Sequence, residues 1–347
     1  MTTIVWKHDT TPDPATILSV GEPSYDPVLQ ILKIGDGSTN YAMLKSLVAS
    51  PQIGLIAGGY TDQASNVVDS ILIPQRANAT DFGDLSIARY GVTACSSSTR
   101  AVFCGGCEYP SPYYNVIDYV EITTLGNGAD FGDMDQTRAG GGQCASSTRG
   151  IIAGGYNDPN NINVISYITI ANTGNAQYFG DLVGGIRRYL GGCESPTRGV
   201  FGGGGSVGAD VYVNIIEYVT IATTGNSQDF GDLTIERGYA SGCGSSTRGI
   251  FGSGLFTPYY YNVIDYVTIA STGNAADFGD LTVARYATAS CTSTTYGTFA
   301  GGKIVGGSGM NIIDYIVIAP LSNAQDFGDL TVERHAAEGC SNCHGGL

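Results

Sequence analysis

The most regular feature of this chain is an apolar run that returns at a nearly constant interval. Each copy is rich in β-branched and aromatic residues, begins at an Asn and ends before a turn such as Thr-Gly-Asn, which is typical of a β-strand. The run lacks a clean alternation of apolar and polar residues, so we expect both faces of the strand to be covered. Its copies occupy residues 66–73, 115–122, 163–170, 214–221, 262–269 and 311–318.

Other markers keep step with this run at a period of about 50 residues. A Gly-Gly pair or a variant of it follows an apolar segment before the run, and Asp-Phe-Gly-Asp-Leu or a close relative comes after it. Each repeat therefore predicts four short strands: a (like ARYGVTACS), b (like RGIIAGG), c (like NVIDYVTIA) and d (centred on DFGDL). Six such four-stranded sheets packed face to face around an axis form a β-propeller.

The two ends of the repeat region predict how the ring closes. The first repeat starts at about Pro51 with strand b, whereas residues 332–342 form a strand a with nothing after it. Pairing that C-terminal strand with the first strand b would complete the first blade and remove an open sheet edge. We expect an all-β chain, with a small β-rich N-terminal module over residues 1–50 and a six-bladed propeller over residues 51–347.

The repeats resemble kelch repeats over roughly residues 51–342, which implies a kelch-like six-bladed β-propeller. The order of Arg, apolar strand, Gly-Gly, Tyr and bulky aromatic residue is present in register, with Phe where kelch motifs usually carry Trp. The Tyr positions are Tyr119, Tyr167, Tyr218, Tyr266 and Tyr315, with Ser70 in the first copy. The Phe positions are Phe82, Phe131, Phe179, Phe230, Phe278 and Phe327.

Repetition also suggests a structural role for the charged residues. A ring of Arg could line a channel and bind an anion, or it could join neighbouring blades by bonding an Asp or loop carbonyls. We favour the second role, because catalytic sites seldom use one residue six times. We expect Phe278 to fill the gap between sheets, Gly279 to let the chain turn, and Asp280 and Arg285 to tie the outer strand to the next blade. The equivalent residues before strand a are Arg89, Arg138, Arg187, Arg237, Arg285 and Arg334, and those before strand b are Arg100, Arg149, Arg198 and Arg248.

Several short motifs resemble catalytic, nucleotide-binding, haem or metal-binding motifs, but the sequence around them does not support those functions. Asp-Phe-Gly lacks the other kinase motifs, and the G-x-G-x-x-G that begins at Gly203 leads into a strand rather than a helix. The C-terminal Cys-Ser-Asn-Cys-His matches a haem-attachment pattern, but Cys340 belongs to the repeat, and nothing nearby completes a zinc site. We expect no cofactor, no metal and no catalysis. We expect buried, reduced thiols at Cys95, Cys144, Cys193, Cys243, Cys291 and Cys340.

Residues 21–47 resemble the N-terminal module of bacteriophage tail fibres and tropism determinants. Gly35 and Gly37 predict a tight turn around Asp36. The resemblance implies that residues 1–50 dock to other virion proteins, and a small β-rich cap on the propeller is the alternative. The matching positions are Gly21, Glu22, Tyr25, Asp26, 32–37, Leu44 and Tyr41, where the family often has Trp.

The composition of the chain mainly argues against certain kinds of partner and against a membrane location. The net charge of −15 and the pI of about 4.4 disfavour nucleic acid and anionic lipid as partners, although the charge also simply aids solubility. No stretch is long and apolar enough to cross a bilayer, and the N-terminus lacks a signal-peptide pattern. We therefore expect neither nucleic-acid binding nor membrane insertion.

The variable segments of this otherwise regular chain predict where binding occurs. The loops between strands b and c differ most between repeats, and several are rich in Tyr, whose rigid ring and polar tip suit a sugar or a protein partner. Alternatively, these rings pack on one another or cover the neighbouring blade. The candidates are Tyr109, Tyr113, Tyr114, Tyr156, Tyr212, Phe256, Tyr259, Tyr260 and Tyr261.

These features favour a non-enzymatic phage virion protein, located in the tail or an appendage and assembled in the host cytoplasm. We expect a tail fibre or receptor-binding protein that presents a propeller face to a host-surface glycan or protein. Fibres of this kind are commonly homo-oligomers, often trimers. The alternatives are a neck, baseplate or capsid decoration protein whose propeller contacts other virion subunits, and a propeller hydrolase of cell-surface polysaccharide.

Overall fold

The computed structural model describes residues 23–26, 31–34, 51–109, 111–206, 211–304 and 306–347 of the chain. The described residues form strands, turns and loops but no helix, and the chain divides into two units, Met1–Pro51 and Gln52–Leu347. In the first unit, β1 (Pro23–Asp26) pairs antiparallel with β2 (Ile31–Ile34). The turn predicted around Asp36 lies outside the described residues.

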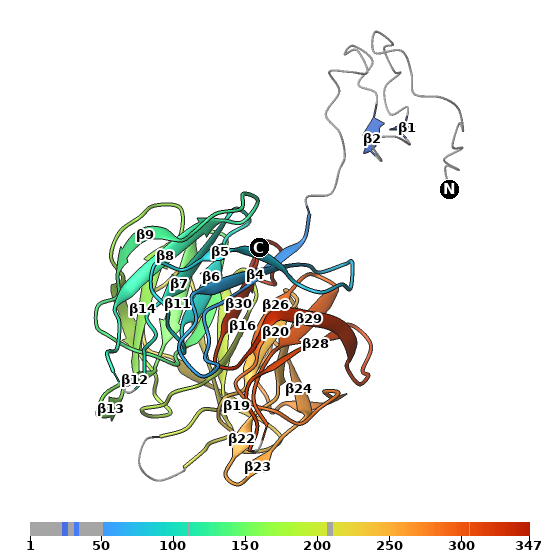
Figure 1. Cartoon of the computed structure of the whole chain (residues 1–347). Coiled ribbons are helices and arrows are strands. Elements are labelled where there is room, and N and C mark those ends of the chain that lie inside the picture. The colour runs from blue at the N-terminus through green and yellow to red at the C-terminus, as the bar shows by residue number, and fades with distance from the viewer. Residues whose placement is uncertain (1–22, 27–30, 35–50, 110, 207–210, 305) are drawn as a thin grey trace. The chain divides into compact units, whose positions relative to one another are not determined.

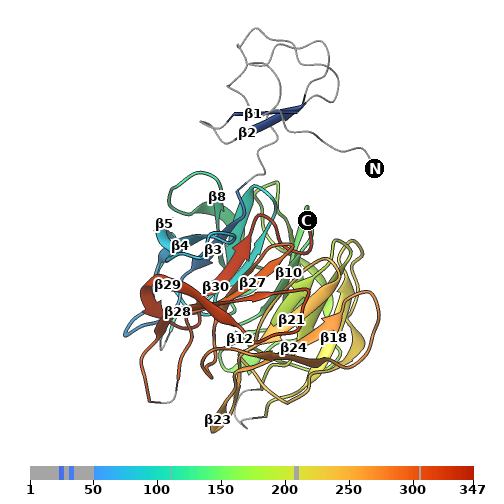
Figure 2. The ribbon, with the colours of Figure 1, turned by 90° about the vertical axis from the view of Figure 1, so that its right-hand side faces the viewer.

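The second unit is a six-bladed β-propeller, as the repeat predicts (Figures 1 and 2). Each blade is a four-stranded antiparallel sheet in the order a, b, c, d. The first three blades are β30 (Glu338–Ser341), β3 (Ile53–Ala57), β4 (Val67–Leu72), β5 (Thr80–Asp84); β6 (Thr93–Ser96), β7 (Arg100–Cys104), β8 (Val116–Glu121), β9 (Ala129–Asp133); and β10 (Gly142–Ala145), β11 (Arg149–Ala153), β14 (Val164–Thr169), β15 (Gln177–Asp181). The other three are β16 (Gly191–Glu194), β17 (Arg198–Gly202), β18 (Ile215–Thr220), β19 (Gln228–Asp232); β20 (Ser241–Gly244), β21 (Arg248–Gly252), β24 (Val263–Thr268), β25 (Ala276–Asp280); and β26 (Ala289–Thr292), β27 (Tyr296–Ala300), β28 (Met310–Val317), β29 (Gln325–Arg334).

The C-terminal strand closes the ring, which confirms the prediction from the repeat ends. β30 pairs antiparallel with β3, with Leu55 opposite Cys340 and Gly54 opposite Ser341. The first blade therefore combines strands from the two ends of the propeller sequence. Closure satisfies the hydrogen bonds of what would otherwise be two open edges.

Strands a of the six blades surround a narrow axial channel. Adjacent strands approach so closely that a Cβ on Gly192 would lie 1.8 Å from the carbonyl oxygen of Gln143. Hydroxyl groups join strands a of consecutive blades: Ser341 Oγ donates to the Thr292 carbonyl at 2.5 Å, and Thr292 Oγ1 donates to the Gly244 carbonyl at 2.9 Å. The small residues of strand a are thus required by the tight inner circle.

The hydrophobic core lies between consecutive sheets. Phe278 is buried in a cluster that also contains Phe299 and Ile316 of the following blade. The strand-a thiols fill the inner part of each seam, where a Cβ on Gly150 would lie only 2.3 Å from Cys95 Sγ of the preceding blade. All described cysteines are free thiols. The glycine after the strand-b Arg is therefore explained by the thiol that it faces.

Gly279 does not mark a turn, contrary to the expectation from the motif. It lies within β25, with a φ of +147°, where the pairing of β24 and β25 shifts register at Ile264 and Asp265. A Cβ on Gly279 would lie 2.7 Å from the Ser322 carbonyl oxygen in the c–d turn of the next blade. The glycine is needed because that turn comes so close to the outer strand.

The arginines before strand a lie at the seams between blades and pair with carboxylates there. Arg285 Nη1 lies 3.0 Å from Asp314 Oδ2 in strand c of the following blade, and the Arg285 carbonyl accepts from the Gly254 N–H of the preceding blade. Asp280 instead bonds the next blade through its backbone N–H, which donates to Asn323 Oδ1 at 3.1 Å. Asp280 and Arg285 therefore contact the next blade through different partners.

Comparable ion pairs recur at all six seams, with each guanidinium almost fully buried. Burial lowers the pKa of Arg237 and Arg285, and the facing carboxylate opposes this shift. Loss of one partner would leave a buried charge without compensation. The pairs are Arg89–Asp118, Arg138–Asp135, Arg187–Glu217, Arg237–Asp265, Arg285–Asp314 and Arg334–Asp69.

Candidate functional site

The b–c loops and the d–a loops share one face of the propeller, which we call the loop face. Two b–c loops carry small hairpins, β12 (Tyr156–Asn157) with β13 (Asn160–Asn161) and β22 (Leu255–Phe256) with β23 (Tyr259–Tyr260), at the lower end of the view in Figure 1. In every blade a backbone bridge joins a b–c residue to a d–a residue. The bridges are Tyr60–His335, Tyr90–Cys107, Ala139–Tyr156, Arg188–Gly205, Gly238–Leu255 and Tyr286–Lys303.

A closed circle of backbone hydrogen bonds rims the channel on the loop face. In each d–a loop, one residue with left-handed φ donates its N–H to the carbonyl of its equivalent in the preceding blade, at 2.5 to 3.1 Å. Two of these residues are glycines and four are not, although non-glycine residues are disfavoured in this conformation. The circle consists of Gly91, Gly140, Tyr189, Tyr239, Ala287 and Ala336. It holds the loops, and hence their side chains, in fixed relative positions.

Aromatic side chains form a continuous row across the loop face. Tyr189 and Tyr239 stack over the channel rim with ring centroids 3.8 Å apart, and Tyr239 meets Tyr286 edge to face at 5.4 Å. The Arg188 guanidinium lies 5.3 Å from the ring of Tyr189 and 4.9 Å from that of Tyr156, which extends the row to the third blade. We define the aromatic row as Tyr113, Tyr156, Arg188, Tyr189, Tyr239, Tyr286 and Tyr260.

The residues predicted from sequence fall into two groups on this face. Tyr109 and Tyr259 are prominently exposed, at 72% and 63% of their surface. The others are partly buried and pack on neighbours: for example, the Tyr212 and Phe256 rings lie 5.7 Å apart, and Tyr114 donates to Glu108. The partly buried ones are Tyr113, Tyr114, Tyr156, Tyr212, Phe256, Tyr260 and Tyr261. The two alternatives drawn from sequence, packing and display, thus apply to different residues.

The d–a residues of this face are not among the candidates predicted from sequence. An aromatic residue recurs directly or two positions after the repeated Arg, and that recurrence could have revealed them. The overlooked rings are Tyr90, Tyr189, Tyr239, Tyr286 and His335.

Several tyrosine, cysteine and histidine side chains of the loop face are neutral near pH 7. Burial raises the pKa of Tyr113 and Tyr286 to about 12 and that of the Cys107 thiol to about 11. Burial, together with nearby Lys303, lowers the pKa of His335 to about 4. Groups poised in this way stack and form hydrogen bonds, but they are poor proton-transfer agents at neutral pH.

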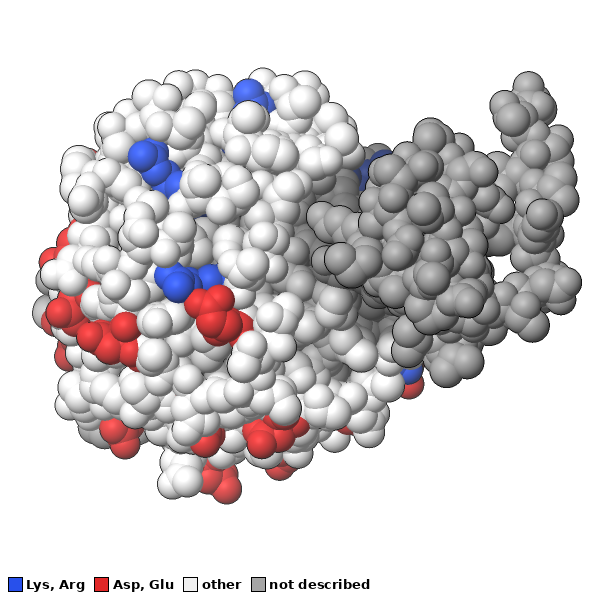
Figure 3. Space-filling model, turned by 90° about the horizontal axis from the view of Figure 1, so that it is seen from above, with Lys and Arg blue, Asp and Glu red and all other residues white. Residues whose placement is uncertain are grey.

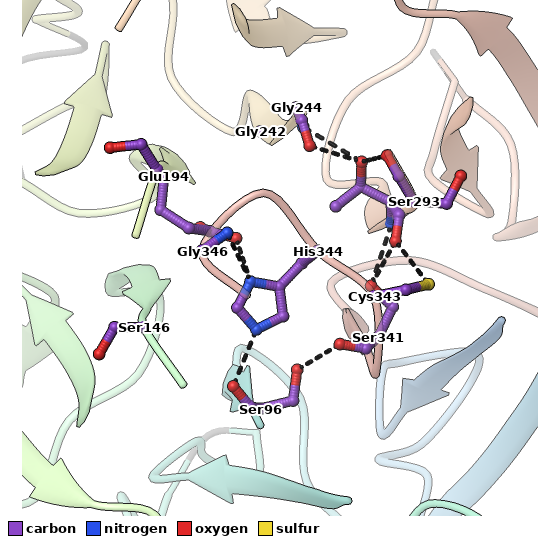
Figure 4. A network of polar contacts seen from close by, with 12 residues as sticks. Ser96, Ser146, Glu194, Gly242, Gly244, Ser293, Ser341, Cys343, His344 and Gly346 are labelled. Carbon is purple, nitrogen blue, oxygen red and sulfur yellow. Dashed lines mark hydrogen bonds and ion pairs between the residues drawn. The ribbon is translucent and has the colours of Figure 1, made fainter. Parts of the chain in front are cut away.

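The C-terminal segment closes the opposite end of the channel (Figure 4). His344 Nδ1 lies 2.9 Å from Glu194 Oε1, and its Nε2 lies 2.9 Å from the Ser96 carbonyl oxygen. Cys343 Sγ donates to the Thr292 carbonyl, so the Cys-x-x-Cys-His residues bond different blades. Among the described residues, no group of three His, Cys, Asp or Glu side chains is arranged to hold a metal ion.

The surface seen in Figure 3 carries mostly uncharged side chains in its described part, and the acidic ones lie mainly toward its edge. The part of the chain that the structure describes contains no helix suited to crossing a membrane. Comparison of the chain with models of protein families and with curated proteins finds no match.

Proposed function

We propose that this chain is a phage virion protein of the tail-fibre type, whose propeller binds a host-surface glycan or protein. The observation that carries the proposal is the aromatic row, which gathers rings from several blades on one face of a repetitive scaffold. Tyrosine rings provide large, rigid contact areas at low entropic cost, and their hydroxyls add directional hydrogen bonds. The closed circle of backbone bonds beneath them would present these rings without further ordering.

The assignment to a virion is supported by the N-terminal resemblance. The antiparallel pairing of Pro23–Asp26 with Ile31–Ile34 falls where tail-fibre modules have a short hairpin between their two conserved motifs. The register of Arg, Gly-Gly, Tyr and Phe supports a kelch-like origin for the propeller. In this arrangement residues 1–50 dock to the virion, and the loop face is left for the host.

A cell-binding and glycan-array measurement on the full chain tests the proposal. The variant Tyr259→Ala/Tyr260→Ala/Tyr261→Ala removes one exposed ring and two partly buried ones, and we expect at least a tenfold loss of binding. Tyr178→Ala is the matched control, because Tyr178 is 57% exposed on outer strand β15, away from the loop face. Equal losses for both variants would contradict a role for the loop face.

Two further outcomes would redirect the assignment. Stable association with purified virions, without binding to host cells or glycans, would show contact with other virion subunits instead. Release of reducing sugar from host envelope would show hydrolysis.

A further inference from the structure

An arginine from strand b stacks on a tyrosine from strand c at four of the six seams. The guanidinium carbon lies 4.3 Å from the ring centroid for Arg149 on Tyr167, and 4.4 Å for Arg100 on Tyr119. Each Arg then reaches the next blade: Arg100 Nη1 donates to the carbonyl oxygens of Ile170 and Ala171 at 3.1 and 3.0 Å. The remaining two stacked pairs are Arg198–Tyr218 and Arg248–Tyr266.

The sixth blade achieves the same arrangement with different residues. Tyr296 replaces the strand-b Arg, and Arg76 enters from the c–d turn of the first blade. Its guanidinium carbon lies 4.4 Å from the Tyr315 ring centroid and 5.6 Å from that of Tyr296. An aromatic ring and a cation therefore occupy this seam too.

Only the first blade lacks both the ring and the cation among the described residues. By strand register, Ile53 replaces the Arg and Ser70 replaces the Tyr. Thr80 lies opposite Ser70, where Gln177 lies opposite Tyr167 in the third blade. The two short hydroxyl side chains bond each other at 3.0 Å and leave above them a space that no described residue fills.

The substitutions leave a cavity of about 330 Å³ between the first and second blades. Ile53, Ile71 and Phe82 line it with apolar surface, and the exposed leucines Leu72 and Leu125 belong to the same lining. A volume of this size lies at the lower end of small-ligand pockets. Apolar residues gathered around one exposed hollow are typical of a ligand-binding groove.

The cavity also keeps the acceptors that a cation uses at the other seams. Ile122 and Thr123 line it, at the repeat positions of Ile170 and Ala171, whose carbonyls accept from Arg100. None of the described residues donates a hydrogen bond to these two carbonyls. The pocket thus combines an apolar slot, at the position that a tyrosine ring fills in other blades, with a pair of carbonyl oxygens suited to a cation.

We propose that this pocket binds an aromatic ring that carries a cationic group. The ring takes the place of the missing tyrosine, against Ile53 and Phe82, and a phenolic hydroxyl meets Ser70 and Thr80. The cation bonds the carbonyls of Ile122 and Thr123. The inference does not depend on the host-binding role of the loop face, because the pocket lies at the c–d side of one seam.

Binding of small probes to the full chain tests this site by NMR titration or calorimetry. Tyramine carries both features, p-cresol lacks the cation, and cyclohexylethylamine lacks the aromatic ring. We expect tyramine to bind at least tenfold more tightly than either control and to perturb the residues that line the pocket. Acetyl-Tyr-Arg-amide distinguishes the source: tighter binding than tyramine indicates peptide side chains, and weaker binding indicates a small amine.

Two variants make the test specific. Ser70→Tyr refills the pocket as in the other blades, so it should fold normally and lose tyramine binding at least tenfold. Arg149→Ile/Tyr167→Ser should create a second pocket in the third blade and raise the stoichiometry to two. The proposal is overturned if tyramine fails to bind the native chain at millimolar concentration, if p-cresol binds equally well, or if a folded Ser70→Tyr protein binds tyramine unchanged.

Discussion

Asp135 and Ser166 have exchanged the residue types that four of the other five blades use at their positions. In the second blade the d–a linker carries Ser86 and strand c carries Asp118, and Ser86 Oγ donates to Asp118 Oδ1 at 2.7 Å. In the third blade the linker carries Asp135 and strand c carries Ser166, which donates to Asp135 Oδ1 at 2.8 Å. Both arrangements place one carboxylate against a buried arginine, so the seam requires the charge but accepts it from either element.

The exchange predicts a strong coupling between these two positions. Asp135→Ser alone leaves Arg138 buried without a carboxylate and should cost about 3–5 kcal/mol of unfolding free energy. Ser166→Asp alone places a second buried carboxylate beside Asp135 and should also destabilise. The double variant restores the arrangement of the second blade and should lie within about 1 kcal/mol of the native chain. Urea unfolding measures all three, and additive losses would contradict the exchange.

The buried ion pair of Arg285 and Asp314 gives a second prediction. Asp314→Asn removes the buried partner of Arg285 and should destabilise by about 3 kcal/mol. Asp280→Asn, the matched control, should change stability by less than about 0.5 kcal/mol, because only the backbone of Asp280 bonds the next blade. Thermal unfolding distinguishes the two variants, and an equal loss for Asp280→Asn would show that the Asp280 side chain also stabilises the seam.

The close approach of Cys95 Sγ to Gly150 predicts that a substitution at one position compensates a substitution at the other. Gly150→Ala places a methyl group against Cys95 Sγ and should cost about 1–3 kcal/mol through overpacking. Adding Cys95→Ala removes the sulfur and should recover most of that loss. The second blade already carries Ala101 at the Gly150 position. Failure of Cys95→Ala to rescue Gly150→Ala in denaturant unfolding would show that the cost has another origin.

Glu338 predicts a pH dependence of stability. It lies at the loop-face end of the axial channel, where burial raises the pKa of its carboxyl to about 8. The folded chain therefore holds a proton between about pH 4.5 and 8 that the unfolded chain releases, so stability falls as pH rises, by at most about 1.4 kcal/mol per pH unit. Glu338→Gln should remove this fall. If the unfolding free energies of the native chain and of Glu338→Gln changed in parallel from pH 5 to 8, the role of Glu338 would be refuted.

The regular part of the fold follows from local pattern. Strand-like runs, Gly-Gly pairs and the DFGDL motif recur in the blades, unchanged or as close variants, and the unpaired ends specify ring closure. The partner of Arg285 could not be obtained in this way, because Asp280 in strand d and Asp314 in strand c are both carboxylates of neighbouring elements. Only the distance between blades selects Asp314 over Asp280.

The six blades, the four strands of each blade and the pairing that closes the ring could be predicted from the sequence. These features depend on patterns of residues that lie near one another within each repeat. Contacts across a seam join residues about 30 or more positions apart in the sequence, and only the folded chain shows which of them meet. The contact between Asp135 and Ser166 is one of these. The tertiary structure also brought Tyr189, Tyr239 and Tyr286 into one row and showed that Ser70 leaves a vacant slot. These contacts join different blades or the two ends of the propeller sequence, so they depend on the curvature and closure of the ring.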